Sequence, residues 1–204
     1  VSTNGPQYLS DSWGSGQNLW IAYVTGQSHN NSEADIRAMC SIDGGQTWSD
    51  AGQVNAIDEL YYFAPGIGGK ADGSSVTILW SRADGVGLYA RTWTRTSGCS
   101  GTWGSIKTLS SLASGSYLTD PEVIYDNNGD ILAAWLEYTG SGTAGIRSSV
   151  STNSGETWSA KAWVTDASDS LATHRWPAFT LDTRNNDVWM AYSYRQTTPT
   201  TLNR

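Results

Sequence analysis

The stretch S-I-D-G-G-Q-T-W, Ser41–Trp48, decides the fold of this chain. Its residue types predict a tight hairpin loop. Asp43 can accept hydrogen bonds from backbone N–H groups just ahead of it, as in an Asx turn, and the two glycines that follow can take the positive φ angles that such a loop requires. Thr47 then returns the chain to β geometry, and Trp48 supplies a large ring that can be buried against a sheet.

The same loop recurs in Ser151–Trp158, S-T-N-S-G-E-T-W, where Asn153 can make the turn that Asp43 makes. Trp103 lies midway between Trp48 and Trp158, 55 residues from each, at the end of the degenerate stretch S-G-C-S-G-T-W. This spacing lies just beyond the longest propeller repeats, which are about 50 residues long. The residues expected to build the two complete loops are Ser41, Asp43, Gly45, Thr47 and Trp48, and Ser151, Asn153, Gly155, Thr157 and Trp158.

Strand-like segments follow the same period. Proline recurs at Pro6, Pro65, Pro121 and Pro177, and after each comes an apolar run that ends in Tyr23, Trp80, Trp135 or Tyr192. Third elements are expected at Ile36–Ser41, Leu88–Trp93 and Ile146–Ser151, and a short fourth element after each loop, as in Gly104–Leu109. Four strands per repeat predict the blades of a β-propeller.

The pattern S-x-D-x-G-x-T-W resembles the Asp box of sialidase-like (BNR-repeat) β-propellers, and the resemblance covers nearly the whole chain. It implies an all-β fold of four-stranded antiparallel blades, with the Asp-box loops on the outer rim and away from the ligand face. One domain, residues 1–204, is expected, with blades at about 6–57, 58–113, 114–169 and 170–204. By fold analogy alone, sialidases, other glycosidases, receptors and adhesins remain open.

The fourth repeat is expected to be incomplete, because its loop tryptophan would fall beyond Arg204. An open fan of blades leaves sheet faces and edges exposed. Three arrangements follow: a larger propeller of six or so blades, which we favour, a four-bladed ring patched by Val1–Gly5 or Thr200–Arg204, or two copies that complete one ring.

The composition limits the classes of partner that the chain is expected to bind. The chain has a net charge of −7, only 15% charged residues and no basic run, which argues against nucleic acid. No apolar stretch approaches the roughly 18 residues of a membrane span, so no membrane insertion is expected. Most of the 11 tryptophans recur at blade positions, which indicates a structural role, and the others are free to stack on sugars. Polar loops, few lysines and many tryptophans favour a secreted or cell-surface protein. The resemblance to sialidase-like propellers implies a glycan or glycoprotein partner.

Neither a cofactor nor a metal is expected. Asp126–Asp130 begins like a calcium loop, but the distal Glu is missing and a hairpin turn is the simpler interpretation. Cys40 and Cys99 are the two cysteines, and either a disulfide or two free thiols is compatible with their positions.

The resemblance implies a ligand site at the mouth of the central channel, near the starts of the innermost strands, where the four prolines lie. Asp120 and Glu122 flank Pro121, and strand residues two apart can point the same way. Such a carboxylate pair suits glycoside chemistry, with one group as acid and the other as base or nucleophile. The alternative is a solvated polar rim.

A second group precedes Pro177. Arg175-Trp176-Pro177 resembles the core of the sialidase F-R-I-P motif, whose arginine binds the substrate carboxylate. Here His174 replaces the Phe, and the motif follows two Asp boxes, whereas sialidases carry it ahead of them. Sialidases also use three arginines, but Arg37 and Arg147 occupy equivalent repeat positions and are interpreted as structural.

The predicted catalytic residues are therefore Arg175, Asp120 and Glu122, and the predicted ligand-binding residues are His174, Trp176, Tyr61 and Tyr62. Because one arginine motif is less than a sialidase needs, the sequence favours an extracellular propeller that binds a glycan or a protein. The alternative is a sialidase-like glycoside hydrolase, whole or in part, so enzymatic activity is left open. A third interpretation is a purely structural repeat module.

Overall fold

The structure is a computed structural model that describes residues 7–25, 35–55, 65–82, 86–140, 144–165 and 172–196. It describes the backbone alone for residues 7–9, 172–175 and 194–196. Every element in these segments is a β-strand. The described residues therefore include no helix of the length and apolarity needed to cross a membrane.

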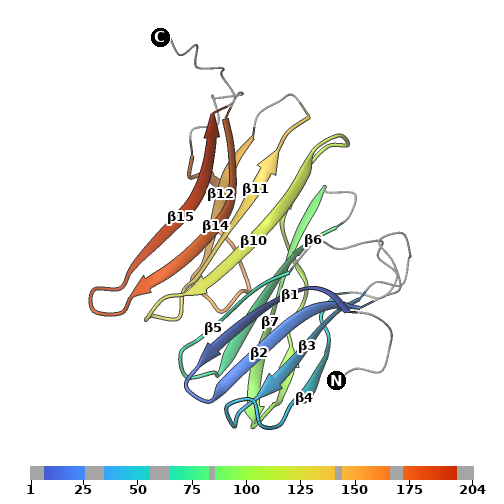
Figure 1. The fold of residues 1–204 in the computed structure, drawn as a ribbon, viewed down its shortest axis with the longest axis vertical. Coiled ribbons are helices and arrows are strands. Elements are labelled where there is room, and N and C mark those ends of the chain that lie inside the picture. The colour runs from blue at the N-terminus through green and yellow to red at the C-terminus, as the bar shows by residue number, and fades with distance from the viewer. Residues whose placement is uncertain are drawn as a thin grey trace, which may run out of the picture.

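The strands form four antiparallel sheets that follow one another in chain order (Figure 1). Sheet one contains β1 (Gln7–Ser15), β2 (Asn18–Thr25), β3 (Asp35–Ser41) and β4 (Ser49–Gln53). Sheet two contains β5 (Gly66–Gly69), β6 (Ser75–Ser81), β7 (Gly87–Ser97), β8 (Ser100–Trp103) and β9 (Lys107–Ser111). Sheet three contains β10 (Tyr117–Tyr125), β11 (Ile131–Tyr138), β12 (Ala144–Ser151) and β13 (Ala162–Trp163), and sheet four contains β14 (Ala172–Asp182) and β15 (Asp187–Gln196). The four predicted apolar runs are the second strands of these sheets.

Sheet two departs from the predicted four strands. Its long third strand, β7, pairs with β8 near its end and with β9 near its start, so the fourth strand is split in two. The split falls where the degenerate loop replaces the Asp-box sequence, and a β7–β8 hairpin through Gly98 takes the place of that loop. The fourth strand was expected over Gly104–Leu109, whereas β9 spans Lys107–Ser111.

The Ser41–Trp48 and Ser151–Trp158 loops share one hydrogen-bond pattern. Ser41 Oγ accepts from Gly45 N at 2.9 Å and Asp43 Oδ1 accepts from Thr47 N at 2.9 Å. In the third sheet Ser151 Oγ accepts from Gly155 N and Asn153 Oδ1 accepts from Thr157 N, both also at 2.9 Å. The predicted Asx-type loop therefore forms twice.

One loop expectation is wrong. Trp48 is 37% exposed rather than buried, because its ring lies against its own loop and its Nε1–H donates to the Gly45 carbonyl at 3.1 Å. Trp158 is the more enclosed of the two and packs against the core between sheets two and three.

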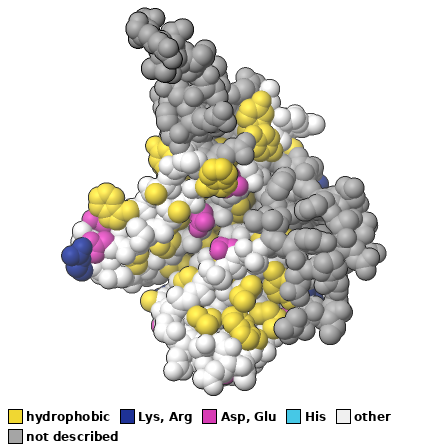
Figure 2. Space-filling model, in the orientation of Figure 1, with side chains coloured by type: hydrophobic (Ala, Val, Ile, Leu, Met, Phe, Trp, Pro, Cys, Tyr) yellow, Lys and Arg dark blue, Asp and Glu magenta, His cyan; other side chains and the backbone are white. Residues whose placement is uncertain are grey.

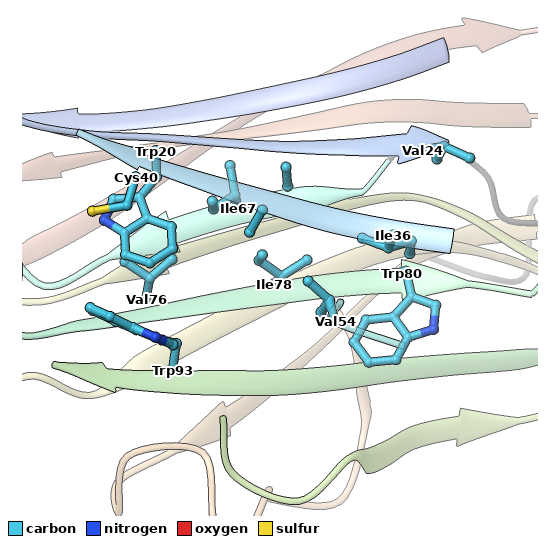
Figure 3. Close-up of a cluster of buried hydrophobic side chains, with 12 residues drawn as sticks. Trp20, Val24, Ile36, Cys40, Val54, Ile67, Val76, Ile78, Trp80 and Trp93 are labelled. Atoms are coloured by element: carbon cyan, nitrogen blue, oxygen red, sulfur yellow. The ribbon is translucent and has the colours of Figure 1, made fainter. Parts of the chain in front are cut away.

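Sheets one and two pack face to face through a hydrophobic cluster drawn in Figure 3. Trp20, Ile36 and Cys40 from sheet one meet Ile78 and other side chains of sheet two. The rings of Trp20 and Trp93 are in edge-to-face contact at 4.6 Å between centroids. Each aromatic ring of this size buries about 150–250 Å² and contributes strongly to such a core.

Sheet two is covered on both faces. All seven residues of β6 are buried, with Val76, Ile78 and Trp80 facing sheet one and Leu79 facing sheet three. A strand buried on both sides needs apolar residues at successive positions, as the V-T-I-L-W run provides. Sheets that each pack between two neighbours are blades of a fan rather than the two layers of a sandwich.

The described sheets do not close into a ring (Figure 1). The first strands adjoin in the order β1, β5, β10 and β14, and sheet four packs on the far side of sheet three. Trp176, Trp189 and Tyr192 of sheet four are exposed, at 65%, 64% and 44%.

A disulfide joins Cys40 of β3 to Cys99 of the β7–β8 turn, with 5.8 Å between the Cα atoms. Of the two alternatives that the sequence left open, the structure has the disulfide. The bond connects sheet one to sheet two beside their shared core, which includes Cys40.

Candidate functional site

The first strands of the sheets meet at a cavity of about 190 Å³, the mouth pocket. Its walls come from β1, from the residue before β5, from β10 and from β14. Figure 2 shows acidic side chains gathered near the middle of the face that it presents. The lining residues are Ser10, Asp11, Pro65, Asp120, Pro121, Glu122, Trp176 and Pro177.

Three of the predicted site residues therefore share one pocket: Asp120, Glu122 and Trp176. The expected position of two of the prolines is wrong. Pro121 and Pro177 lie inside β10 and β14, at β-bulges, and not at the strand starts.

At each of these bulges the residue before proline has a positive φ, 51° at Asp120 and 54° at Trp176. Positive φ is uncommon for residues other than glycine, and such strain gathers at functional sites. The bulge also replaces simple strand alternation as the reason that Asp120 and Glu122 reach the same pocket. In both sheets, the bulge with its positive φ directs the residue before proline, Asp120 or Trp176, toward the mouth pocket.

Asp120 is held on one side only. Its Oδ1 accepts a hydrogen bond from Thr119 Oγ1 at 3.2 Å, whereas its Oδ2 is buried and has no partner among the described residues. An unpaired buried carboxylate oxygen is costly, so it is a ready acceptor for a ligand hydroxyl.

Glu122 lies beside Asp11, which the sequence did not single out. Burial, and secondarily the negative charge of Asp11, raise the pKa of Glu122 from 4.5 to about 7. Asp11 Oδ2 accepts a hydrogen bond from the backbone N–H of Ile67 at 2.9 Å, which fixes it between sheets one and two. Glu122 thus shares the pocket with Asp11 and Asp120, and carboxyl groups in differing environments are what acid–base pairs require.

Two glycines bring the first strands close together. A Cβ on Gly66 would lie 2.1 Å from the Pro121 carbonyl oxygen, and a Cβ on Gly68 would lie 2.4 Å from that of Val123. Both clashes are with backbone, so neither neighbour can rotate away. The G-I-G-G sequence of β5 therefore lets β10 approach and places Glu122 next to Asp11.

The other predicted ligand residues are less fully placed. Trp176 lines the mouth pocket with most of its ring exposed. His174 and Arg175 lie in β14, opposite Tyr194 and Ser193, but their side chains are outside the described part of the structure. Tyr61 and Tyr62 lie outside the described residues altogether.

Arg37 and Arg147 serve the blades and not the mouth. They occupy equivalent register positions, opposite Tyr23 and Trp135. Arg37 pairs with Asp50, and Arg147 donates to the buried Glu137 through Nε at 3.2 Å and Nη2 at 3.1 Å.

The Asp126–Asp130 stretch forms the turn between β10 and β11. Asp126 Oδ1 accepts from the backbone N–H groups of Asn128 and Asp130 at 2.9 and 2.8 Å, and its Oδ2 accepts from Asn186 of sheet four at 2.9 Å. The described residues contain no cluster of potential metal ligands.

A sequence signal for Asp11 did exist. Aligning the sheets on the aromatic that ends each second strand places Asp11, Gly66, Glu122 and Ala178 in the same position, one residue past the bulge or proline. Pro6, the proline of the first repeat, lies five residues before Asp11, whereas the other prolines directly precede this position. The extra residues in β1 hid the correspondence.

The fold is that of a sialidase-like β-propeller. No protein-family model matches the sequence, and no curated protein matches it. Similar solved structures include a Penicillium chrysogenum α-L-arabinanase complexed with arabinobiose, with 12% identity over 92% of this chain and a TM-score of 0.66. The GH93 α-L-arabinofuranosidase of Fusarium graminearum with arabinobiose has 15% identity over 97% and a TM-score of 0.63.

The Trypanosoma rangeli sialidase is also similar, with 14% identity over 93% of this chain and a TM-score of 0.59. The chain spans 57% of the Penicillium structure, 65% of the Fusarium structure and 34% of the Trypanosoma structure. At these identities the likeness concerns the fold, and the role of the mouth pocket must be argued from its own residues.

Proposed function

We propose that this chain binds a saccharide in the mouth pocket and that its carboxyl groups make it a glycoside hydrolase. The observation that carries the proposal is the meeting of Asp11, Asp120 and Glu122 with the exposed Trp176 in one cavity. Most glycosidases need one carboxyl group that is protonated near neutral pH and one that is ionised. Glu122, with its pKa raised to about 7, suits the acid.

The remaining groups suit binding. Trp176 offers an aromatic face on which a sugar ring can stack. Asp120 presents an unpaired oxygen that can accept a sugar hydroxyl or activate a water molecule. In this scheme Glu122 donates its proton to the leaving glycosidic oxygen, and Asp11 or Asp120 acts as the base or nucleophile on the other side.

The described lining favours a neutral sugar. Three carboxyl groups face the pocket, and they would repel the carboxylate of a sialic acid. The arabinobiose held by the Penicillium and Fusarium enzymes is a neutral disaccharide, which supports this choice. Sialoside cleavage is the alternative, and it depends on Arg175 acting as a carboxylate clamp.

A non-catalytic glycan-binding or protein-binding module is the second candidate. The 65% exposure of Trp176 favours it, because a ring so accessible can bind a glycan without enclosing its glycosidic bond. Separating the two candidates requires turnover and binding to be measured on the same variants.

We also propose a secreted or cell-surface location, supported by the Cys40–Cys99 disulfide, since such bonds persist mainly in oxidising compartments. The exposed side chains of Trp189 and Tyr192 on sheet four support either further blades or a second copy packing there.

The test is hydrolysis of aryl α-L-arabinofuranoside, arabino-oligosaccharides and a fluorogenic sialoside by the wild type and three variants. Glu122→Gln should abolish turnover of the arabinosides yet retain binding, and Trp176→Ala should weaken binding. Glu156→Gln, at an exposed position of a rim loop, is the matched control. Binding without turnover by the wild type would support the module, and sialoside turnover lost in Arg175→Ala would support the sialidase. Neither binding nor turnover on any of these substrates would overturn the assignment to saccharides.

A further inference from the structure

A second groove lies between sheets two and three, at the end of the strands opposite the mouth pocket. It encloses about 260 Å³ and is bordered by the turn after β5 and the turn after β10. Lys70 of this groove follows Pro65 of the mouth pocket by five residues, which at about 3.3 Å per residue of extended chain separates the two sites by roughly 16 Å. Its lining is therefore distinct from that of the mouth.

Two cations, Lys70 and Arg95, line this groove. No ion pair formed by the described residues includes Lys70 or Arg95. The Lys70 stem extends from sheet two to Gly129 of sheet three. The two are so close that a Cβ on Gly129 would lie 3.3 Å from Lys70 Cε. This contact directs the ammonium group over the groove.

Arg95 is positioned by neutral contacts. Its Nη2 donates to Asn18 Oδ1 at 2.8 Å, and its backbone N–H donates to the Ser74 carbonyl at 2.9 Å. Its Nε is buried and has no hydrogen-bond partner in the described structure. The guanidinium is held in place but not neutralised.

Hydroxyl groups supply much of the remaining lining. Buried Tyr125 forms part of the wall, and its hydroxyl is tied to Ser75 Oγ at 3.1 Å and Thr77 Oγ1 at 2.7 Å. Thr152 and Ser154 contribute from the loop of sheet three. Hydroxyl groups and two cations on rigid strands make a surface for a small anion that accepts several hydrogen bonds.

Nearby carboxylates offset part of this positive charge. Asp72 Oδ1 accepts hydrogen bonds from the Ser74 Oγ–H and N–H at 2.6 and 2.8 Å, and these bonds, together with the charge of Lys70, lower the pKa of Asp72 and keep it ionised. Asp130 is the one acidic residue among the described groove residues. The lining itself, with Lys70 and Arg95 against Asp130, has one net positive charge within a chain whose net charge is −7.

We propose that this groove binds an oxyanion, the sulfate or phosphate group of a small ester, between Lys70 and Arg95. The groove is independent of the mouth pocket, so the proposal stands whether or not the chain cleaves saccharides. Asp130 distinguishes an anion site from a cation site, because its carboxylate repels an anion and would attract a cation.

Isothermal titration with sodium sulfate, sodium phosphate, glucose 6-sulfate and glucose 6-phosphate tests the site, with chloride at matched ionic strength and plain glucose as reference ligands. We expect saturable binding that Lys70→Gln weakens at least about tenfold, as for the loss of one charge-assisted hydrogen bond. Asp130→Asn should tighten binding by about threefold. Arg184→Gln is the matched control, because the exposed Arg184 side chain pairs with Asp182 and does not line the groove.

Binding of the free anions and the esters alike, or of the esters alone, supports the proposal and identifies the source of the group. The proposal is overturned if no oxyanion binds above the chloride reference or if Lys70→Gln binds like Arg184→Gln. Weaker binding by Asp130→Asn would also overturn it, since that result indicates a cation. Thermal unfolding of each variant tests whether the fold is retained.

Discussion

Asp11 and Glu122 occupy the same register position in the first strands of two different sheets. Asp11 pairs with Ala22 in sheet one, and Glu122 pairs with Ala134 in sheet three. Sheet two, which lies between them, has Gly66 at this position and so leaves the space open. The repeat therefore delivers two carboxyl groups to one pocket from blades that are not neighbours in sequence.

The raised pKa of Glu122 predicts a pH-dependent stability change in Glu122→Gln. Below its ordinary pKa of 4.5, Glu122 is protonated in both the folded and the unfolded chain, so the variant and the wild type should be equally stable. Between 4.5 and about 7 the unfolded chain ionises more readily, and the wild type loses stability as pH rises. Discounted for the remaining solvent exposure of the group, the variant should gain on the order of 1–2 kcal/mol at pH 8.

Urea unfolding at pH 4 and pH 8 measures this difference. Glu156→Gln is the control, because Glu156 is an exposed partner of Lys107 and should show little gain at pH 8. An equal effect of Glu122→Gln at both pH values would contradict the assignment of the raised pKa.

The close approach of β5 and β10 predicts that Gly66→Ala is strongly destabilising. The added methyl group would meet the Pro121 carbonyl at 2.1 Å, so the two strands must separate and the mouth pocket must widen. Overpacking of this kind typically costs about 1–3 kcal/mol. Gly104→Ala is the matched control, because its nearest neighbour, the Thr92 carbonyl, would lie at an ordinary 3.4 Å. Similar unfolding free energies for the two variants would show that β10 can yield.

Much of the fold could be predicted from the sequence because the same residue types recur in the same local order in several repeats. The loop residues specify their own hydrogen bonds, so Asp43 and Asn153 make equivalent turns without help from distant residues. The split fourth strand of sheet two was not predictable in this way, since it depends on how a degenerate loop pairs with β7.

The candidate site was harder to predict because it is assembled across sheets. Pro121 marks Asp120 and Glu122 in the sequence, but the bulge that orients them depends on how β10 pairs with β11. Asp11 carries no local motif, and its importance comes from its contact with Ile67 and its charge near Glu122. Such neighbours follow from the stacking of blades and not from strand periodicity.

The two equivalent loops predict opposite effects of exchanging one residue. Ser154 has a φ of 60° where the first loop has Gly44 at 71°. A left-handed conformation costs a residue with a side chain about 1 kcal/mol relative to glycine. Ser154→Gly should therefore stabilise the fold by about 0.5 kcal/mol after the entropy of the unfolded glycine is counted, and Gly44→Ser should destabilise it by a similar amount. Chemical denaturation of both variants checks the pair, and a shift of the same sign in both would refute the equivalence.

Asp43 predicts an acid-sensitive first loop. Hydrogen bonds from Thr47 and Ser41 lower the pKa of Asp43 from 3.8 to about 2. Its stabilising contribution is therefore complete above pH 4 and is lost as the pH falls toward 2. Asp43→Asn copies the third-sheet loop, so its melting temperature should fall less than that of the wild type between pH 5 and pH 2.5. Asn153→Asp should respond in the reverse sense, and the same pH dependence in all three proteins would contradict this account.

The Cys40–Cys99 bond predicts that the packing of sheets one and two depends on oxidation. It closes a separation of 59 residues, and removing such a bond typically costs about 2–4 kcal/mol. The Cys40→Ala/Cys99→Ala double variant should lose this stability, and adding a reductant should lower the wild type to a similar level while leaving the variant unchanged. Thiol titration of the denatured, unreduced wild type should find no free thiol, and then two after reduction. If the reductant shifts both proteins equally, or if free thiols are present before reduction, the bond does not join these two sheets in solution.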